Sequence, residues 1–191
     1  MKNFQSIFFY VFICSLILTG ITSCHDDDHD HNDEELITTM RYTLLDTAGN
    51  STVVLIFRDV DGDGGNPPEF VVTGQLKQNT YYQGSMQLFN DSVDPGEDIT
   101  PEILQEGTDH QFFYGISTGL NMSFGYADAD ANGKPIGLKT ILNTGGASSG
   151  TLKIILRHQA DKNAAGVSNG NPTNAGGETD IEVDFVNLSI Q

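Results

Sequence analysis

The sequence predicts an all-β protein: an antiparallel, immunoglobulin-like β-sandwich with about nine strands and one short helix. From Leu36 onward, apolar residues alternate with polar ones at a period of two, which is the pattern of strands with one buried face. Gly, Asn and Pro fill the intervals, and no helical segments alternate with the runs. The sequence therefore favours two sheets packed face to face over a parallel α/β fold, which needs such helices.

Nine runs carry the strand prediction, and the clearest of them extends from Leu120 to Tyr126. Each run has one apolar face that we expect to point into the core. In chain order, these inward residues are Leu36, Met40, Tyr42 and Leu44; Val53, Leu55 and Phe57; Phe70 and Val72; Tyr82, Met86 and Leu88; His110, Phe112, Tyr114 and Ile116; Leu120, Met122, Phe124 and Tyr126; Leu138 and Leu142; Leu152, Ile154 and Leu156; and Ile181, Val183 and Phe185.

The connections contain turn residues and one helical signal. A short helix is predicted from Thr100 to Glu106, with Thr100 as its N-cap and Pro101 at the first helical position, where no N–H is needed. Turns are predicted at Gly62 to Pro68, at Asn132-Gly133, at Gly145-Gly146 and across Asn163 to Gly177.

Composition excludes two classes of function. The chain has 191 residues, with 26 Asp plus Glu, 9 Lys plus Arg and a formal net charge of −17. Phosphate backbones repel such a chain, so we expect no unaided nucleic-acid binding, and it offers no basic helix to a membrane surface. The length suits one folded domain, which we expect to span residues 36–191.

Residues 1–23 have the composition of a secretory signal peptide. The apolar run from Ile7 to Leu18 is shorter than the roughly 20 residues of a membrane-spanning helix. The segment Ile21-Thr22-Ser23-Cys24 resembles the bacterial lipobox, which implies cleavage before Cys24 and lipidation of its thiol. The alternative is an ordinary signal peptide with a chance cysteine. Because Cys14 leaves with the signal, no thiol remains in the folded part.

Residues 24–35 are acidic and His-rich, and we expect them to form a solvated tether. The segment resembles the export signal of Bacteroidetes lipoproteins, which implies the outer face of the outer membrane; an anchor facing the periplasm is the alternative. His25, His29 and His31 lie among its aspartates, and imidazole with carboxylate suits zinc, copper or nickel. The other interpretation is a hydrophilic spacer that binds no metal.

Two loops fit the pattern D-x-D-x-[DN]-G, in which alternate oxygens can converge on a calcium ion. Neither is an EF-hand, because Phe70 and Lys139 stand where an EF-hand has its bidentate glutamate. The alternative is that the side chains only cap hairpin turns. The candidate ligands are Asp59, Asp61 and Asp63 in the first loop and Asp128, Asp130 and Asn132 in the second.

His110 and His158 both fall in the apolar phase of their strands. If both point inward from facing strands, they can share an ion or an acidic partner. The alternative for each is a hydrogen-bonded histidine of the core. We predict no enzymatic activity, because the chain has no G-x-S-x-G elbow, no H-E-x-x-H helix, no phosphate loop and no G-x-G-x-x-G turn.

Several segments resemble a family of small flavobacterial lipoproteins over essentially the whole mature chain. Its members are sometimes labelled as a type 1 periplasmic binding fold, which implies two α/β lobes; this chain departs from that pattern in its length and its lack of helices. The segments, besides the lipobox and tether, are Asp61-Gly62-Asp63-Gly64-Gly65-Asn66, Asp109-His110-Gln111-Phe112-Phe113-Tyr114, Gly137-Leu138-Lys139-Thr140 and Ala175-Gly176-Gly177-Glu178-Thr179-Asp180-Ile181.

The predicted function is that of an outer-membrane-anchored, non-enzymatic lipoprotein. We expect it to bind a divalent metal or a small ligand and to pass it to a TonB-dependent outer-membrane receptor. The alternative is an adhesion or structural interaction domain without a metal, in which the aspartate loops only stiffen turns. The ligand, the oligomeric state and the order of the strands stay open.

Overall fold

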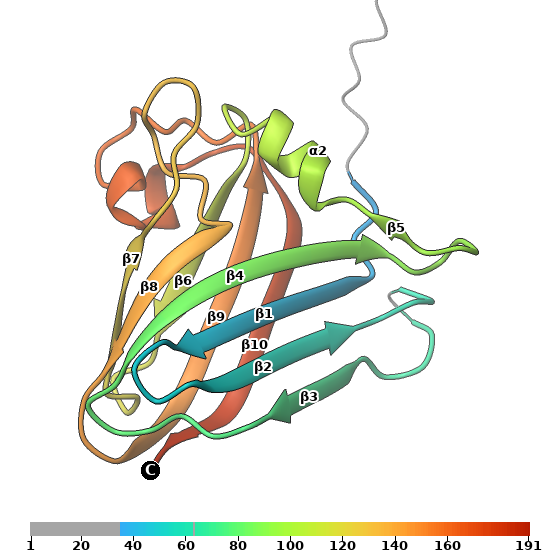
Figure 1. Ribbon diagram of the computed structural model, residues 1–191. Helices are drawn as coiled ribbons and strands as arrows, with labels where there is room; N and C mark the ends of the chain where they lie inside the picture. The colour runs from blue at the N-terminus through green and yellow to red at the C-terminus, as the bar shows by residue number, and fades with distance from the viewer. Residues whose placement is uncertain (1–34, 63) are drawn as a thin grey trace, which may run out of the picture. The chain divides into compact units, whose positions relative to one another are not determined.

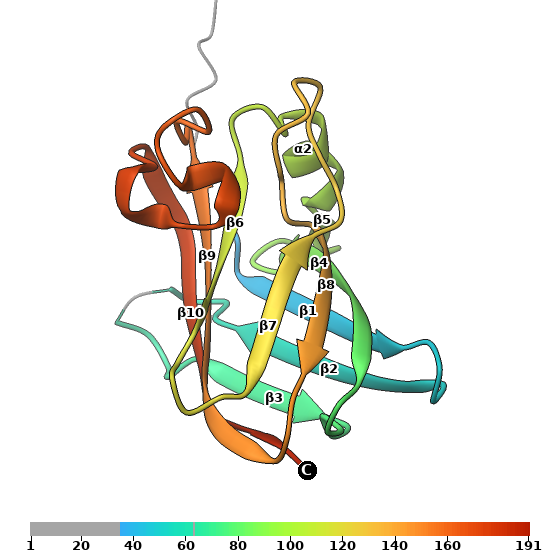
Figure 2. The ribbon, with the colours of Figure 1, turned by 90° about the vertical axis from the view of Figure 1, so that its left-hand side faces the viewer.

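The alternating runs form ten strands in two packed antiparallel sheets in a computed structural model, which describes residues 35–62 and 64–191 (Figures 1 and 2). The larger sheet has the order β3-β2-β1-β4-β8-β7, with the short β5 paired to β4, and the smaller has the order β10-β9-β6. The predicted β-sandwich is confirmed at the level of two packed antiparallel sheets. The larger sheet contains β1 (Thr39–Asp46), β2 (Ser51–Arg58), β3 (Glu69–Thr73), β4 (Tyr81–Asn90), β5 (Glu97–Asp98), β7 (Met122–Tyr126) and β8 (Lys139–Thr144); the smaller contains β6 (Gln111–Ile116), β9 (Ser148–His158) and β10 (Glu178–Ile190).

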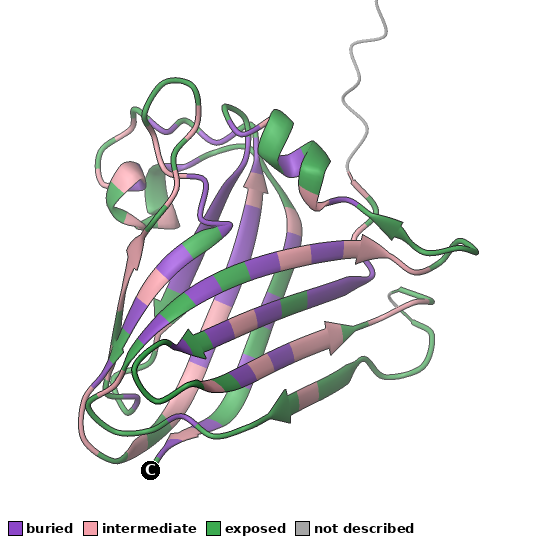
Figure 3. Cartoon of the chain, in the orientation of Figure 1, coloured by how far each residue is buried: buried purple, intermediate pink, exposed green. Residues whose placement is uncertain are grey.

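The core lies between the sheets, and its residues follow the predicted period of two. On β1, Met40, Tyr42 and Leu44 are fully buried, and the alternation of buried and exposed positions runs along most strands in Figure 3. Each such side chain contributes about 1.5–3 kcal/mol by leaving water. Phe112 on β6 and Phe185 on β10 complete the opposite wall of the same core.

Two edge regions depart from the expected burial. Phe70 and Val72 are exposed because β3 is the outermost strand of the larger sheet and only part of its face is covered. Leu36 is also exposed, since it precedes β1 and is not part of the strand. The predicted inward positions were therefore wrong for these three residues, because the pattern alone does not tell a central strand from an edge.

The predicted helix exists as α2 (Thr100–Gln105), but its N-cap is Ile99 and not Thr100. The hydroxyl of Thr100 is used elsewhere, because its Oγ1 accepts a hydrogen bond of 2.9 Å from the backbone N–H of Leu88 on β4. The backbone N–H of Thr100 donates to Oδ1 of Asp98 at 2.9 Å. The threonine thus fastens the helix to the sheet and does not cap its end.

The run Asn163 to Gly177, predicted as turns, forms a cap over the outer face of the smaller sheet. It contains two 3-10 helices, η1 (Val167–Asn169) and η2 (Pro172–Asn174). Val167 and Ala175 are fully buried and pack with Phe113 and Ile155 in a second apolar cluster. The smaller sheet is therefore covered on both faces near the end at which β9 finishes.

None of the helices in residues 35–62 and 64–191 has the length and apolar composition needed to cross a membrane. The predicted signal peptide, the lipidated Cys24, the tether histidines His25, His29 and His31, and Asp63 lie outside the described residues.

Candidate metal centre

Two histidines meet at the end of the smaller sheet where β9 ends and where β6 and β10 begin. His158 is the last residue of β9, and His110 directly precedes β6. Because Gln111 of β6 pairs with Arg157 of β9, the two histidines lie side by side on neighbouring strands. Their rings stack with centroids 4.6 Å apart and planes inclined by 18°. They come from adjacent strands of one sheet, not from facing strands as expected.

The ring of His110 has a defined orientation of its nitrogens. Its Nδ1 lies 3.1 Å from the carbonyl oxygen of Glu106, which follows α2. A carbonyl can only accept, so Nδ1 carries the proton and donates it. In the neutral ring, Nε2 therefore presents a lone pair, which is the state that metal-binding histidines adopt when a carbonyl orients the other nitrogen.

Glu35 supplies a carboxylate to this pair of histidines. Its Oε1 lies 3.0 Å from Nε2 of His110, and its Oε2 lies 4.0 Å from Nδ1 of His158. The Glu35 side chain is only 6% exposed. The expectation that residue 35 belongs to a solvated tether was wrong for this side chain, because its carboxylate packs against two buried imidazoles.

The three side chains form a group with metal-ligand spacing. One ligand atom from each of Glu35, His110 and His158 lies within 4.8 Å of the other two. Neither Nε2 of His110, which is 0% exposed, nor Oε2 of Glu35 makes a hydrogen bond with a described residue. A hydrogen-bonded core histidine therefore accounts for Nδ1 of His110, whereas Nε2 makes no hydrogen bond with a described residue and lies 3.0 Å from Oε1 of Glu35, which is an ion pair if the ring is protonated.

A second carboxylate approaches the group from β10. Oδ2 of Asp180 lies 3.9 Å from Nε2 of His110, and the Asp180 side chain is 0% exposed. Asp180 sits at an irregularity in the β9–β10 pairing, because Thr179 pairs with Arg157 and Ile181 pairs with Leu156. Such a bulge redirects one side chain, which here turns a residue with the phase of Glu182 and Asp184 toward the histidines.

A pocket of about 520 Å³ adjoins the group on one side. Asp180 lines it together with Ile37, Phe57 and Ile181, so the same residue borders both the pocket and the histidine pair. Asp59 and Asp61 also line this pocket, and its lining contains no Lys or Arg. Carboxylates around a hollow attract cations to it.

The first aspartate loop uses its described carboxylates within the turn. Oδ1 of Asp59 accepts a hydrogen bond of 3.0 Å from the backbone N–H of Gly62. Oδ2 of Asp61 accepts from the backbone N–H of Asn66 at 3.0 Å and from its side-chain amide at 2.7 Å. These bonds, the backbone one first, hold the pKa of Asp61 below its usual value.

The second loop is built in the same way and is more buried. Asp128 accepts from the backbone N–H groups of Gly137 and Lys139 at 2.7 and 2.8 Å. Asp130 accepts from the backbone N–H groups of Asn132 and Lys134 at 2.8 and 2.9 Å, and from Nζ of the buried Lys162 at 2.9 Å. Within the described part of the chain, neither loop forms a group of three His, Cys, Asp or Glu ligands, and calcium binding there stays a prediction.

Burial and pairing shift the pKa values of Asp130 and Lys162, which form an ion pair. Burial raises the pKa of Asp130, but the bonds from Lys134, Lys162 and Asn132 outweigh it and hold the pKa below the usual value. Burial lowers the pKa of Lys162, against the attraction of Asp130. Lys162 Nζ also donates to the carbonyl oxygen of Gly107, so the residue directly before the cap is tied to two neighbouring loops.

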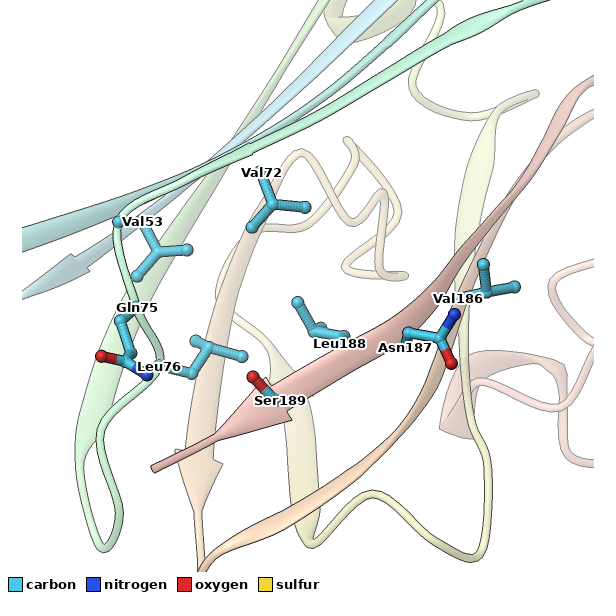
Figure 4. A pocket seen from close by; sticks show the side chains of 9 residues that line it. Val53, Val72, Gln75, Leu76, Val186, Asn187, Leu188 and Ser189 are labelled. Atoms are coloured by element: carbon cyan, nitrogen blue, oxygen red, sulfur yellow. The ribbon is translucent and has the colours of Figure 1, made fainter.

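A further pocket, of about 310 Å³, lies between β10 and the segment that follows β3 (Figure 4). Apolar side chains from both sides line it, among them Val53, Val72 and Leu188, with Gln75, Asn187 and Ser189 as its polar side chains. No lining residue is ionisable, so this pocket offers no acid, base or strong metal ligand.

Comparisons of the chain with family models, with curated proteins and with solved structures find no match. The resemblance to flavobacterial lipoproteins therefore stays a prediction from motifs, and the function must be argued from the site itself.

Sequence reasoning found two members of the group, and it missed Glu35 and the neighbouring Asp180. The phase of the apolar pattern identified His110 and His158 as inward residues. Glu35 was hidden in a run of seven acids between Asp26 and Glu35, where nothing distinguishes one carboxylate from the next. Asp180 was hidden by the period of two, because no signal in the sequence marks the bulge.

Proposed function

We propose that this protein binds a divalent transition-metal ion, zinc above all, through Glu35, His110 and His158. The observation that carries the proposal is the position of His110 Nε2, which lies 3.0 Å from Oε1 of Glu35 without a hydrogen bond to any described residue. When the imidazole is neutral with its proton on Nδ1, the lone pair of Nε2 and the carboxylate repel each other. A cation between them removes the repulsion, and it satisfies the buried oxygen as well.

The chemistry of the donors supports zinc. Two imidazoles and a carboxylate are common zinc ligands, and no thiol is available among the described residues. Calcium instead takes six to eight oxygen ligands, so it does not suit a site with two nitrogens. Copper and nickel accept imidazole as well, and metal availability decides among them in a cell.

In this proposal the metal is carried by a lipoprotein anchored through Cys24 at the outer membrane. The lipobox-like segment and the acidic tether support the anchor. A non-enzymatic role in capturing the ion and passing it to an outer-membrane receptor is consistent with the lack of catalytic motifs in the sequence. The adhesion alternative predicts no response to any metal.

The test is zinc titration of the mature chain, residues 24–191 with Cys24→Ser, in competition with a chromophoric chelator. All described core residues lie within this span, so it retains the complete sandwich. We expect one tight zinc site in the parent chain. We expect it to persist when His25, His29 and His31 are changed to Ala, since the tether is then excluded as the source.

Changing both core histidines to Gln should abolish tight binding, and Glu35→Gln should weaken it strongly. Gln has a similar volume to His and can keep the contact with the Glu106 carbonyl, and circular dichroism checks the fold. Retention of the tight site in the His110→Gln, His158→Gln variant would overturn the proposal. Loss of zinc binding in the tether variant alone would assign the metal to the tether.

A further inference from the structure

Strand β10 forms an edge of the smaller sheet. It pairs with β9 on one side, and the order β10-β9-β6 places no described strand on its other side. One end of this open side is closed, because Ile190 forms a bridge with Leu76 and the N–H of Gln191 donates to the Leu76 carbonyl oxygen at 2.9 Å. Between the two register shifts of the β9–β10 pairing, residues 181–185 form a regular strand with an open edge.

The inner face of β3, across the sandwich from this edge, is only partly covered. Phe70 and Val72 have the inward phase, because Val72 pairs with the buried Leu55 of β2. The ring of Phe70 contacts that of Phe185 on β10, with centroids 5.8 Å apart. Even so, Phe70 remains 48% exposed and Val72 remains 47% exposed. A further strand beside β10, at the usual spacing of about 4.8 Å, would cover these two side chains.

A groove follows the open edge between β10 and the end of the larger sheet. Three pockets of about 520, 400 and 310 Å³ are lined in turn by residues 179–182, 182–184 and 186–189 of β10. The first two share Phe57 and Glu182. The third lies further along both strands, between Val72 of β3 and Leu188 of β10 (Figure 4). A row of hollows along a strand edge suits an extended chain.

The outer face of β10 carries acids along the same stretch. Glu182 and Asp184 point away from the core, and their side chains are 47% and 44% exposed. From the covered side, Lys153 of β9 pairs with both, at 3.0 Å from Asp184. One lysine leaves this acid pair with an excess of negative charge. A lysine on a strand at the open side would meet the same two acids, and cross-strand pairs of opposite charge stabilise a sheet.

We infer that the open edge of β10 binds an extended segment of a basic partner protein as an added strand. Apolar residues of the segment cover Phe70 and Val72, and they alternate with Lys or Arg residues that pair with Glu182 and Asp184. The inference does not depend on the proposed metal function.

Charge argues against two other occupants of this edge. A second copy of the chain would bring the acids of its own β10 against Glu182 and Asp184. Residues 24–34, which precede the described part of the chain, contain no Lys or Arg and several aspartates. The acids therefore oppose self-pairing and favour a basic strand.

The first experiment measures the binding of a labelled synthetic peptide, about seven residues long, that alternates valine with lysine. Fluorescence anisotropy follows its titration with the chain of residues 24–191 carrying Cys24→Ser. We expect saturable binding, and none for a peptide with glutamate in place of lysine. No saturable binding of the valine–lysine peptide up to about 1 mM would overturn the inference. Equal binding of a peptide with the same residues in two separate blocks would also overturn it, because such a peptide has no apolar face.

A pair of charge variants tests the outer face of the added strand. Glu182→Gln with Asp184→Asn should weaken peptide binding by about 2–30-fold, the worth of two cross-strand ion pairs. Glu97→Gln with Glu102→Gln changes the net charge equally at two exposed positions outside the groove, and it should leave the affinity unchanged. Equal affinities of these two double variants would contradict pairing at the β10 edge.

A pair of valine variants tests the inner face. Val72→Thr should weaken peptide binding about threefold or more, because it removes apolar surface that the peptide covers. Val93→Thr is the matched control, since Val93 is also 47% exposed but lies in the connection after β4, outside the three pockets. An affinity of Val72→Thr equal to that of Val93→Thr would contradict the predicted cover of β3.

Amide hydrogen exchange distinguishes the two open sheet edges. When the peptide binds, N–H groups within residues 181–185 should exchange about tenfold more slowly or less, because the added strand accepts hydrogen bonds from them. Glu69–Thr73 of β3, at the edge of the larger sheet, should show no such change. Protection of β3 alone would overturn the assignment to β10. A dimer of the parent chain that the peptide dissociates, measured by light scattering, would assign the edge to a second copy instead.

Discussion

The carboxylates of the second aspartate loop accept hydrogen bonds from four backbone N–H groups and from Lys162, whereas Oε2 of Glu35 accepts none from the described residues. Both regions contain buried acids close to cationic or titratable partners. In the loop, the chain itself supplies every donor, so the acids stabilise a turn. At the histidine pair, the described residues supply no hydrogen-bond donor to Oε2 of Glu35, and in our proposal an external cation takes that place. A carboxylate motif is therefore informative about metals only when its oxygens are not already used by the backbone.

The largest effect should come from breaking the buried ion pair between Asp130 of the second aspartate loop and Lys162. Asp130→Asn leaves Lys162 buried and charged without its partner, and loss of one member of a buried pair costs about 3–5 kcal/mol of unfolding free energy. Urea denaturation measures it. The matched variant that also carries Lys162→Met should recover most of the loss. A cost below about 1 kcal/mol for Asp130→Asn would show that the pair does not brace the loop.

The next largest effect should come from removing the proposed metal ion from Glu35, His110 and His158. An ion that binds only the folded chain, at about 100 times its Kd, stabilises it by about 2.7 kcal/mol. For a chain of this size, chelation should then lower Tm by about 5–11 °C. Calorimetry with and without chelator checks this. In Glu35→Gln the difference should shrink, and an undiminished difference would place the ion elsewhere.

Acid should weaken the fold through Asp130, with a smaller effect in the accessible range. Its folded pKa lies below the ordinary 3.8, so its contribution is present above 3.8 and is lost as pH falls through the lowered folded value. Urea midpoints measured from about pH 5 downward should therefore fall less steeply in Asp130→Asn than in the parent chain. Identical slopes would mean that other carboxylates dominate the acid response.

The smallest effect should come from the first aspartate loop. Asp59→Asn together with Asp61→Asn keeps an oxygen acceptor at each position, so stability should change by less than about 0.5 kcal/mol and zinc affinity should not change. Calcium should leave the Tm of both chains unaltered in a thermal-shift assay. A calcium-dependent rise in the parent chain that the double variant lacks would instead support the predicted calcium site.

Local signals predicted a large part of this molecule correctly. The period of two on β1, with Met40, Tyr42 and Leu44 all buried, follows from strand geometry, which any sequence window reveals. The inward direction of His110 and His158 follows from the same phase. The exposure of Phe70 could not be predicted in this way, because exposure at a sheet edge depends on which strands lie beside it and not on the strand itself.

The sequence by itself determined the sandwich, the short helix and the two inward histidines, since each depends on neighbours only a few residues away. Only the tertiary structure decided which acids meet those histidines. Glu35 lies 75 positions before His110, and Asp180 reaches the group through a bulge that one extra residue in β10 creates. Strand order and pairing register are long-range properties, and they alone bring four such side chains to one end of a sheet.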